Sequence, residues 1–238
     1  MSNDRRQHLR RLLAADGQAD LRVDRICDAC VTALDISGAG VTVLSKAPGS
    51  GSEHHRGLVH ASDPVSARLE DLQLTVGEGP CVDAFATGGP ILVPDLAAAL
   101  SRWPAFGSGA AGLGAAAVFS FPLQVGVVRL GSLDLYRDRP GLLTHEQVTD
   151  ALLLADLATQ AVVDQLDGHA TSDLTWLADS HVEIHQAVGM VKIQLDATTD
   201  VALLRLRGYA FSQGLTLSHV ARQVVARTLR FTPTEEPA

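Results

Sequence analysis

A cluster of positive charge near the C-terminus is the first feature of this 238-residue sequence that could do chemistry. Residues 197–232 hold five arginines against one acidic residue, Asp200, which is five minus one, or +4, in a chain of formal net charge −8. These arginines are Arg205, Arg207, Arg222, Arg227 and Arg230. Guanidinium groups beside aromatic rings recognise unpaired RNA bases and phosphates. The local excess is a first indication of a functional surface, and the acidic charge of the whole chain argues against a protein that coats nucleic acid through bulk positive charge.

Three other motifs resemble chemical sites but have the wrong context or spacing. Residues 107–112 spell G-x-G-x-x-G, yet they follow no strand, so we expect a flexible turn and not a dinucleotide site. His181 and His185 have metal-ligand spacing, but Glu183 stands one position late for a zinc protease. The C-x-x-C at residues 27–30 lies on the apolar face of an expected helix, where small core residues are the better interpretation. We therefore expect no catalytic residues, no metal site and no enzyme activity.

Hydrophobic periodicity outlines the elements that position these residues. Helices are expected at 20–34, 64–72, 81–86, 96–100, 105–111 and 144–167, and strands at 40–45, 57–61, 91–93, 115–123 and 126–136. Thr144 is the expected cap of the last helix, 75–80 an expected loop, and Gly131–Ser132 the expected place of a bulge. Because the order is not a βαβ alternation, we expect an α+β fold with a mostly antiparallel sheet flanked by helices.

The chain after residue 168 is expected to be helical and separate. Three apolar stripes predict a compact three-helix bundle. They run from Leu174 to Leu195, from Ala202 to Ala210 and from Leu217 to Thr228. The predicted division is a helical extension at 1–19, an α+β domain at 20–167, a linker at 168–173, a helical domain at 174–231 and a disordered tail at 232–238.

Composition sets the broad class. Hydrophobic residues make up 46% and charged residues 19% of the chain, which is enough for a packed core. No apolar run is long enough to cross a bilayer, and the arginine-rich N-terminus lacks the pattern of a signal peptide. Three cysteines imply no closed disulfide framework. We expect a cytoplasmic protein that does not bind membranes.

Residues 183–229 resemble an ANTAR domain, a helical RNA-binding family. The family pattern is an Ala-x-Gly with an apolar pair, a Leu-Arg-x-x-Ala and a Leu-x-x-Val-Ala, one in each of three helices. Here these are Ala187-Val-Gly189-Met190-Val191, Leu206-Arg207-Gly-Tyr-Ala210 and Leu217-Ser-His-Val220-Ala221. One departure is Val188, which stands where the family often has lysine, a residue expected to contact RNA.

Residues 20–167 are similar to a GAF domain, a sensor family. The matching segments are Gly77-Glu-Gly-Pro-Cys81, Thr87-Gly-Gly-Pro-Ile-Leu-Val-Pro-Asp95-Leu, Arg102-Trp-Pro-Ala-Phe106, Phe121-Pro-Leu123 and Gly131-Ser-Leu-Asp-Leu-Tyr136. Together the two parts resemble the GAF–ANTAR regulators of actinobacteria. The resemblance implies a signal-responsive regulator that binds paired RNA hairpins in leader transcripts and favours transcription antitermination.

This interpretation defines the candidate site residues. The RNA contacts are expected at Lys192, Arg205, Arg207, Tyr209, Arg222 and Arg227, although without the family resemblance a merely solvated face would be preferred. A small-molecule pocket, with no known cofactor, is expected in the GAF-like domain near Cys81, Phe119 and Phe121. A surplus of apolar residues on 147–165 predicts a homodimer through the helices around 147–165 and 174–195.

Two other functions stay open. The helical bundle could dock a protein partner without binding RNA, which the departure at Val188 would favour. Three short helices can also mimic a helix-turn-helix, although duplex DNA is not the expected ligand.

Overall fold

The computed structural model describes residues 21–46, 54–167 and 182–232, with residues 9 and 13. The expected linker at 168–173, most of the N-terminal extension, most of the tail and His181 lie outside the described residues. Within the described ranges, no helix is both long and apolar enough to span a membrane.

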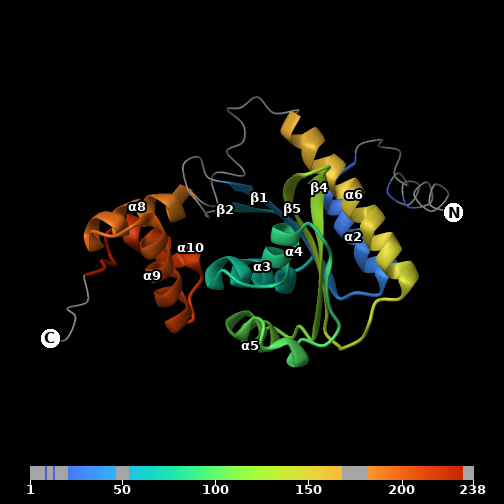
Figure 1. Cartoon of the computed structure of the whole chain (residues 1–238), viewed down its shortest axis with the longest axis horizontal. Coiled ribbons are helices and arrows are strands. Elements are labelled where there is room, and N and C mark those ends of the chain that lie inside the picture. The colour runs from blue at the N-terminus through green and yellow to red at the C-terminus, as the bar shows by residue number, and fades with distance from the viewer. Residues whose placement is uncertain (1–8, 10–12, 14–20, 47–53, 168–181, 233–238) are drawn as a thin grey trace.

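A five-stranded antiparallel sheet forms the centre of the first domain (Figure 1). Its strand order is β2-β1-β5-β4-β3, and every neighbouring pair runs antiparallel. The strands are β1 Gly38–Lys46, β2 His54–Ala61, β3 Ile91–Val93, β4 Ala117–Val125 and β5 Val128–Arg137. The expected antiparallel α+β architecture is confirmed. The expected bulge lies one residue earlier than predicted, because Leu123 pairs with Gly131 and Gln124 with Arg129, which leaves Leu130 as the extra residue.

Helices cover both faces of this sheet. The helices α2 (Val23–Leu34) and α6 (His145–Asp167) pack on one face (Figure 1). The opposite face is covered by α3 (Pro64–Val76), α4 (Pro80–Thr87) and α5 (Pro104–Gly112), with the 3₁₀ turn η1 (Ala97–Ala99) beside α5. The larger core lies between the sheet, α2 and α6, and a smaller one lies under α3 and α5.

Local signals explain where the helices begin and end. Asp63 caps α3 by accepting from the amides of Val65 (2.7 Å) and Ser66 (3.0 Å), and Pro64 occupies the first turn. Thr144 caps α6 as predicted: its hydroxyl accepts from the Gln147 amide (3.2 Å), while the Gln147 side chain accepts from the Thr144 amide (2.9 Å).

The glycine-rich segment 107–112 is helical, so the expected helix at 105–111 is confirmed and the flexible turn expected for 107–112 was wrong. It forms most of α5, whose first amides are capped by the Glu78 carboxylate, 2.8 Å from the Ala105 nitrogen and 3.1 Å from that of Phe106. A Cβ at Gly107 would lie 2.6 Å from the Leu100 side chain. These glycines therefore allow close helix packing and do not form a hinge.

The cysteines on α2 are core residues, as predicted. Cys27 and Cys30 are free thiols and fully buried beneath the sheet. Burial raises the pKa of the Cys27 thiol to about 12, with a further contribution from the negative charges of Asp28, Asp24 and Glu70. A thiol of this kind is inert and not a redox centre.

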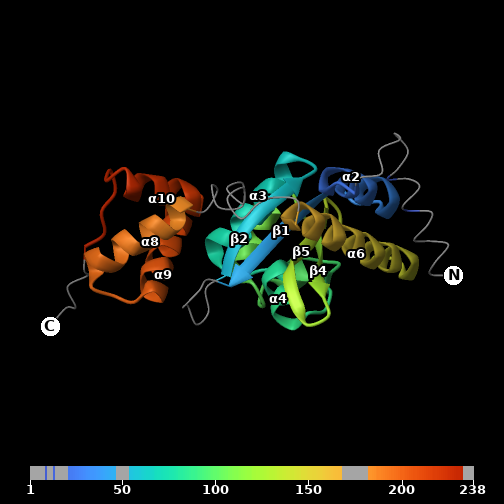
Figure 2. The same cartoon turned by 90° about the horizontal axis from the view of Figure 1, so that it is seen from above.

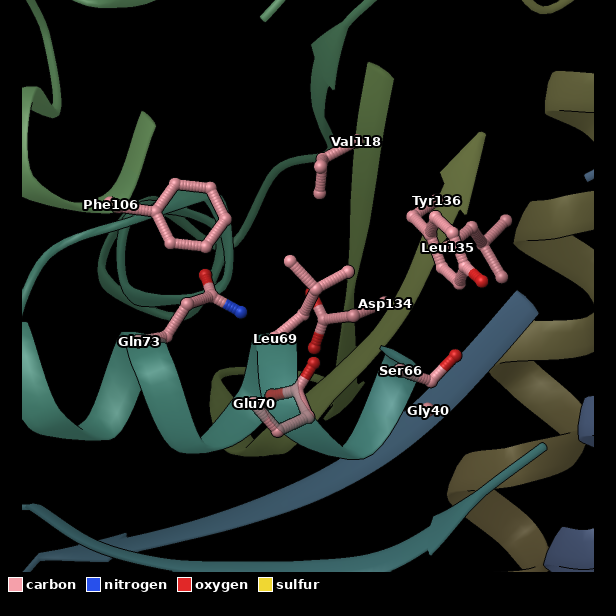
Figure 3. A pocket seen from close by; sticks show the side chains of 10 residues that line it. All are labelled: Gly40, Ser66, Leu69, Glu70, Gln73, Phe106, Val118, Asp134, Leu135 and Tyr136. Atoms are coloured by element: carbon pink, nitrogen blue, oxygen red, sulfur yellow. The ribbon is translucent and has the colours of Figure 1, made fainter. Parts of the chain in front are cut away.

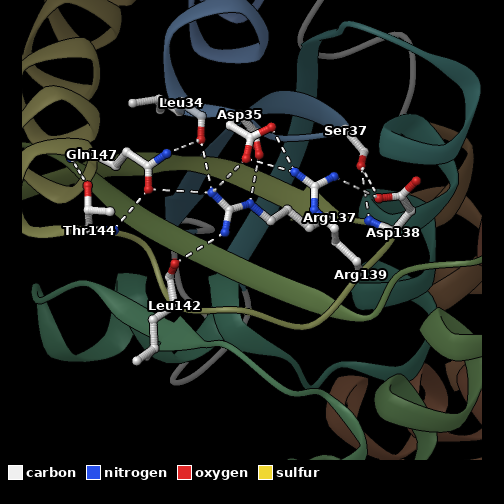
Figure 4. Close-up of polar contacts among 9 residues, drawn as sticks. All are labelled: Leu34, Asp35, Ser37, Arg137, Asp138, Arg139, Leu142, Thr144 and Gln147. Carbon is white, nitrogen blue, oxygen red and sulfur yellow. Dashed lines mark hydrogen bonds and ion pairs between the residues drawn. The ribbon is translucent and has the colours of Figure 1, made fainter.

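Arg137, at the end of β5, joins three elements (Figure 4). Its guanidinium donates to the backbone oxygens of Asp35 (2.7 Å), Leu34 (3.1 Å) and Leu142 (3.2 Å). Gln147 of α6 donates to the same Leu34 oxygen at 2.9 Å. Arg137 thus satisfies the last carbonyls of α2, which otherwise lack partners in the helix, and ties α2 to the start of α6.

Packing of α6 against other parts of the same chain explains most of its excess of apolar residues. Most of the apolar residues that predicted a dimer are buried in the larger core, where α2 covers the part that the sheet does not. Leu152 is 43% exposed, and the side chain of Leu166 is not among those that the structure describes. The homodimer stays a prediction, but the surplus no longer requires it.

Three helices after residue 182 form a second unit around a core of their own. They are α8 (Val182–Leu195), α9 (Thr199–Ser212) and α10 (Leu217–Val225), and we refer to them as the three-helix unit. Thr198 and Thr216 cap α9 and α10 through their hydroxyls. Figures 1 and 2 both show this unit on the side of α3, away from α2 and α6.

Candidate functional site

One face of the central sheet is apolar and the other is polar. Because side chains alternate along a strand, Phe119, Phe121, Leu133 and Leu135 face α2 and α6 in the larger core. The residues between them face α3 and α4. We call this second surface the polar face, and its buried polar residues are Thr42, Ser120, Ser132 and Asp134.

The helix α3 presents polar side chains to the polar face. Ser66, Glu70 and Gln73 are spaced four and three residues apart, so they lie on one side of α3, and all three are buried. The Thr42 hydroxyl donates to the Glu70 carboxylate at 2.9 Å. The Gln73 side-chain oxygen accepts from the Cys81 amide, also at 2.9 Å, which fixes the start of α4 against α3.

Asp134 lies at the centre of the polar face. Its two carboxylate oxygens accept hydrogen bonds from two serine hydroxyls, one from Ser120 on β4 and one from Ser132 at 2.6 Å on β5. Buried polar groups need partners of this kind, because an unsatisfied one costs about 1–3 kcal/mol. The serines hold the carboxylate in one orientation, toward α3.

A small cavity lies between the polar face and α3 (Figure 3). The space open to the centre of a water-sized sphere is about 10 Å³, which is near the minimum for one water molecule. It is lined by Gly40, Ser66, Leu69, Glu70, Gln73, Phe106, Val118, Asp134, Leu135 and Tyr136. Sites for drug-sized ligands measure roughly 300–1,000 Å³, so an organic ligand would require these side chains to move.

Tyr136 and Asp63 occupy one end of this region. The tyrosine hydroxyl donates to the Asp63 carboxylate at 3.2 Å. Burial raises the pKa of Tyr136 to about 12, and the charge and hydrogen bond of Asp63 add to that rise. The phenol is therefore a fixed hydrogen-bond donor at neutral pH and not a base.

Three potential metal ligands meet at the polar face. A carboxylate oxygen of Glu70, the thiol sulfur of Cys81 and a carboxylate oxygen of Asp134 all lie within 4.8 Å of one another, and all three residues are buried. The sequence predicted no metal site, since Asp134 is distant in the chain from Glu70 and Cys81, which lie on two consecutive helices. The signal that could have indicated it is the strand alternation Leu133-Asp134-Leu135, which buries a carboxylate.

The predicted pocket residues do not come together. Cys81 lies beside the cavity, within reach of Glu70 and Asp134. Phe119 and Phe121 lie in the opposite layer, in the core formed with α2 and α6. The glycine-rich loop and the aromatic residues suggested the pocket. Side chains alternate between the two faces of a strand, however, and only those on the polar face reach the cavity.

Most of the predicted RNA contacts lie on the surface of the three-helix unit. Lys192, Arg205, Arg222 and Arg227 are exposed. Arg207 is half-buried, and so is Tyr209, whose ring packs edge-on against Phe231 with centroids 5.5 Å apart. Val188 is buried in the core of the unit, so its side chain is not at the surface.

The three-helix unit contacts α3 of the first domain. The Leu217 amide of α10 donates to the buried Thr75 hydroxyl at 3.0 Å. A Cβ at Gly77 would lie 2.7 Å from the Arg207 guanidinium. Partial burial raises the pKa of Asp71, and the nearby positive charge of Arg222 offsets part of that rise. We call this surface the α3 contact, and it includes two of the predicted RNA-binding arginines.

Comparison with known proteins identifies the first domain. The family model described as the GAF domain matches residues 22–163. No curated protein matches the chain.

Solved structures agree on the fold of that region. The GAF domain of a phosphoenolpyruvate-protein phosphotransferase from Coxiella burnetii is 16% identical, with a TM-score of 0.52 over 70% of this chain and 96% of that one. The corresponding Acinetobacter domain is 12% identical, with a TM-score of 0.51 over 72% and 99%. The N-acylhomoserine lactone-dependent LuxR-family transcription factor CepR2 from Burkholderia cenocepacia is 16% identical, with a TM-score of 0.53 over 69% and 98%. At these identities the likeness shows the fold alone.

Proposed function

The chain belongs to the GAF domain family, a family of mainly sensory and regulatory domains, and from this premise we propose that it is a signal-responsive regulator of RNA. In this proposal residues 174–231 form an ANTAR-like domain that binds hairpins in leader transcripts and favours antitermination. The GAF domain at residues 22–163 supplies the signal. The protein is proposed to act in the cytoplasm, without enzyme activity.

The α3 contact is the observation that carries this proposal. Two of the predicted RNA contacts lie at this surface: Arg207 beside the Gly77 turn, and Arg222 near the charge of Asp71 on α3. Arg207 is half-buried, whereas Arg222 and the other cations of the set are exposed, so RNA can approach those directly. A signal that loosens the α3 contact would uncover Arg207 for RNA and would move the negative charge of Asp71 away from Arg222, which links sensing to binding.

The first test identifies the RNA. Transcripts that crosslink to the full chain in cells should be enriched in leaders that contain paired hairpins. A hairpin pair from such a leader then serves as the probe in a filter-binding assay, with duplex DNA of similar length as the comparison.

The second test uses one exposed arginine and a matched control. Arg205→Ala removes a cation from the surface of α9, whereas Arg25→Ala removes the same charge from α2, on the other side of the sheet. A cation that meets a loop base contributes about 1–3 kcal/mol, so Arg205→Ala should weaken binding roughly five- to 150-fold. If both variants bind the hairpins as the wild type does, Arg205 is solvated surface only.

A second candidate function is protein docking, and exposed apolar side chains favour it. The three-helix unit exposes Ile193 (80%) on α8 and Leu204 (68%) on α9. Further exposed apolar residues on the same two helices are Val182, Val201 and Phe211. Loss of protein–protein crosslinks in Leu204→Gln, with unchanged RNA binding in Arg205→Ala, would favour this function. A homodimer through these helices is one form of it, which light scattering of both variants would detect.

A further inference from the structure

We propose that Glu70, Cys81 and Asp134 bind one divalent first-row transition-metal ion, of the zinc type, at the polar face of the sheet. The proposal concerns the GAF domain alone and does not depend on RNA binding. The three residues come from α3, α4 and β5, so an ion held by them would join the two helices to the sheet.

The donor atoms are close to the arrangement that such an ion needs. They lie within 4.8 Å of one another. Tetrahedral zinc, with Zn–O distances of about 2.0–2.2 Å and a Zn–S distance of about 2.3 Å, places its ligand atoms roughly 3.3–3.7 Å apart. Bringing atoms that are up to 4.8 Å apart to these separations requires movements of roughly 1 Å.

Hydroxyl groups behind the two carboxylates already orient them. Thr42 donates to Glu70, and Ser120 and Ser132 donate to Asp134. Partners of this kind are characteristic of metal-binding carboxylates, because they fix the oxygen that faces the ion. The polar face thus supplies both the ligand atoms and the groups that hold them.

Gln73 is an independent indication of a ligand at this place. Its side chain is 1% exposed and lines the cavity, and Figure 3 shows its nitrogen directed into that space. The side-chain oxygen is fixed by the Cys81 amide, whereas the nitrogen has no hydrogen-bond partner among the described residues. This donor requires an acceptor, and a metal-bound water in the fourth position would provide one. The cavity has room for one such water.

The donor set decides the class of metal. Magnesium and calcium are bound by oxygen atoms, whereas a thiolate with two carboxylates suits zinc and its neighbours in the first transition series. Three anionic groups cannot all be ionised in a buried cluster unless protons or a cation neutralise them. Binding of the ion therefore releases to solvent the Cys81 thiol proton and any proton carried by the two carboxyls.

The test uses the full chain after treatment with a chelator, and cobalt(II) as a coloured substitute for zinc. We expect one equivalent of cobalt to bind, to give a thiolate-to-cobalt absorption band in the near ultraviolet, and to be displaced by zinc. Cys81→Ala should abolish the band and weaken zinc binding at least tenfold. Asp134→Asn, which keeps the shape of the side chain, should weaken it by a similar factor.

Cys30→Ala is the matched control, because Cys30 is equally buried but lies on α2, across the sheet. It should keep the band. Circular dichroism establishes that each variant is folded, and if Cys81→Ala is not, Cys81→Ser and Asp134→Asn decide the matter. Three results would overturn the proposal: no saturable cobalt or zinc binding by folded wild type, a band that survives removal of the Cys81 thiol, or equal binding of magnesium.

Discussion

Replacing Thr75 with valine would test how the sensor domain holds the three-helix unit. The Thr75 hydroxyl accepts from the Leu217 amide at 3.0 Å, and both residues are buried. Leu217 is the first residue of α10, where amides lack partners within the helix. Valine has nearly the same shape but no acceptor, so the amide would be buried without a partner whenever the two parts are in contact.

The expected effect follows from that single lost acceptor. An unsatisfied buried amide costs about 1–3 kcal/mol, whereas in the separated state water accepts from it. The contact should therefore weaken by a factor of roughly five to 150. Amide hydrogen exchange, measured by NMR, would show this as a similar fall in the protection of Leu217.

Thr159→Val is the control for this experiment. Thr159 is also buried, but its hydroxyl donates to the Ala155 oxygen within α6, so its loss leaves no amide without an acceptor. Unchanged protection of Leu217 in a folded Thr75→Val variant would refute the reasoning, as would an equal loss in Thr159→Val. If the α3 contact restricts RNA access, Thr75→Val should also bind hairpin RNA more tightly.

Three further predictions concern the GAF domain. Asp63→Ala should lower the free energy of unfolding in urea by about 1–2 kcal/mol through loss of the α3 cap. Burial alone would raise the pKa of Asp63, but hydrogen bonds from Ser66, Ser62 and Val65 bring it below the ordinary 3.8. The stabilisation by the ionised Asp63 is therefore fully present above pH 3.8 and is lost as the pH falls through the lower pKa of the folded state. A destabilisation by Asp63→Ala that stays constant down to about pH 2 would contradict this. Gly77→Ala (φ +74°) and Gly114→Ala (φ +88°) should each cost about 1–2 kcal/mol of backbone strain. Only Gly77→Ala should displace Arg207 and lower the hydrogen-exchange protection of the Leu217 amide, because a Cβ at Gly114 meets nothing within 4 Å. Because the pKa of Cys27 is about 12, a thiol-specific reagent at pH 8 should label it only when urea unfolds the chain, and rapid labelling of the folded protein would show that it is accessible.

The sequence predicted the elements of the fold well where a local signal exists. The alternation of the long strands, the Thr144 cap and the short strand at Ile91–Val93 were all recognisable from neighbouring residues. Helix ends were less certain. The sequence placed the end of this helix at residue 72 and a loop at 75–80, but α3 continues to Val76, because Gly77 ends it and Thr75 does not.

The candidate sites could be predicted only in part, since they depend on contacts between distant residues. Glu70 and Asp134 are 64 positions apart, and Thr75 and Leu217 are 142 apart, so no local pattern relates them. Aromatic residues suggested a pocket on the wrong face of β4, although the serine between Phe119 and Phe121 was the better indication of the polar side. The exposure of Lys192, Arg205 and Arg222 followed from helical spacing, whereas Arg227 lies beyond the end of α10 at Val225.

The hydrogen bonds of Arg137 anchor the N-terminal end of α6, whereas Val162 is the last described residue of this helix in the larger core. Arg137 and Gln147 hold the N-terminal end of this helix to α2 and the sheet. The helix has 23 residues, so its other end, at Asp167, lies roughly 33 Å away at 1.5 Å per residue. A tilt of about 5° around the anchored end would therefore move the far end by roughly 3 Å. Small rearrangements in the GAF domain would therefore cause larger displacements at the C-terminal end of α6, from which the chain continues toward the three-helix unit.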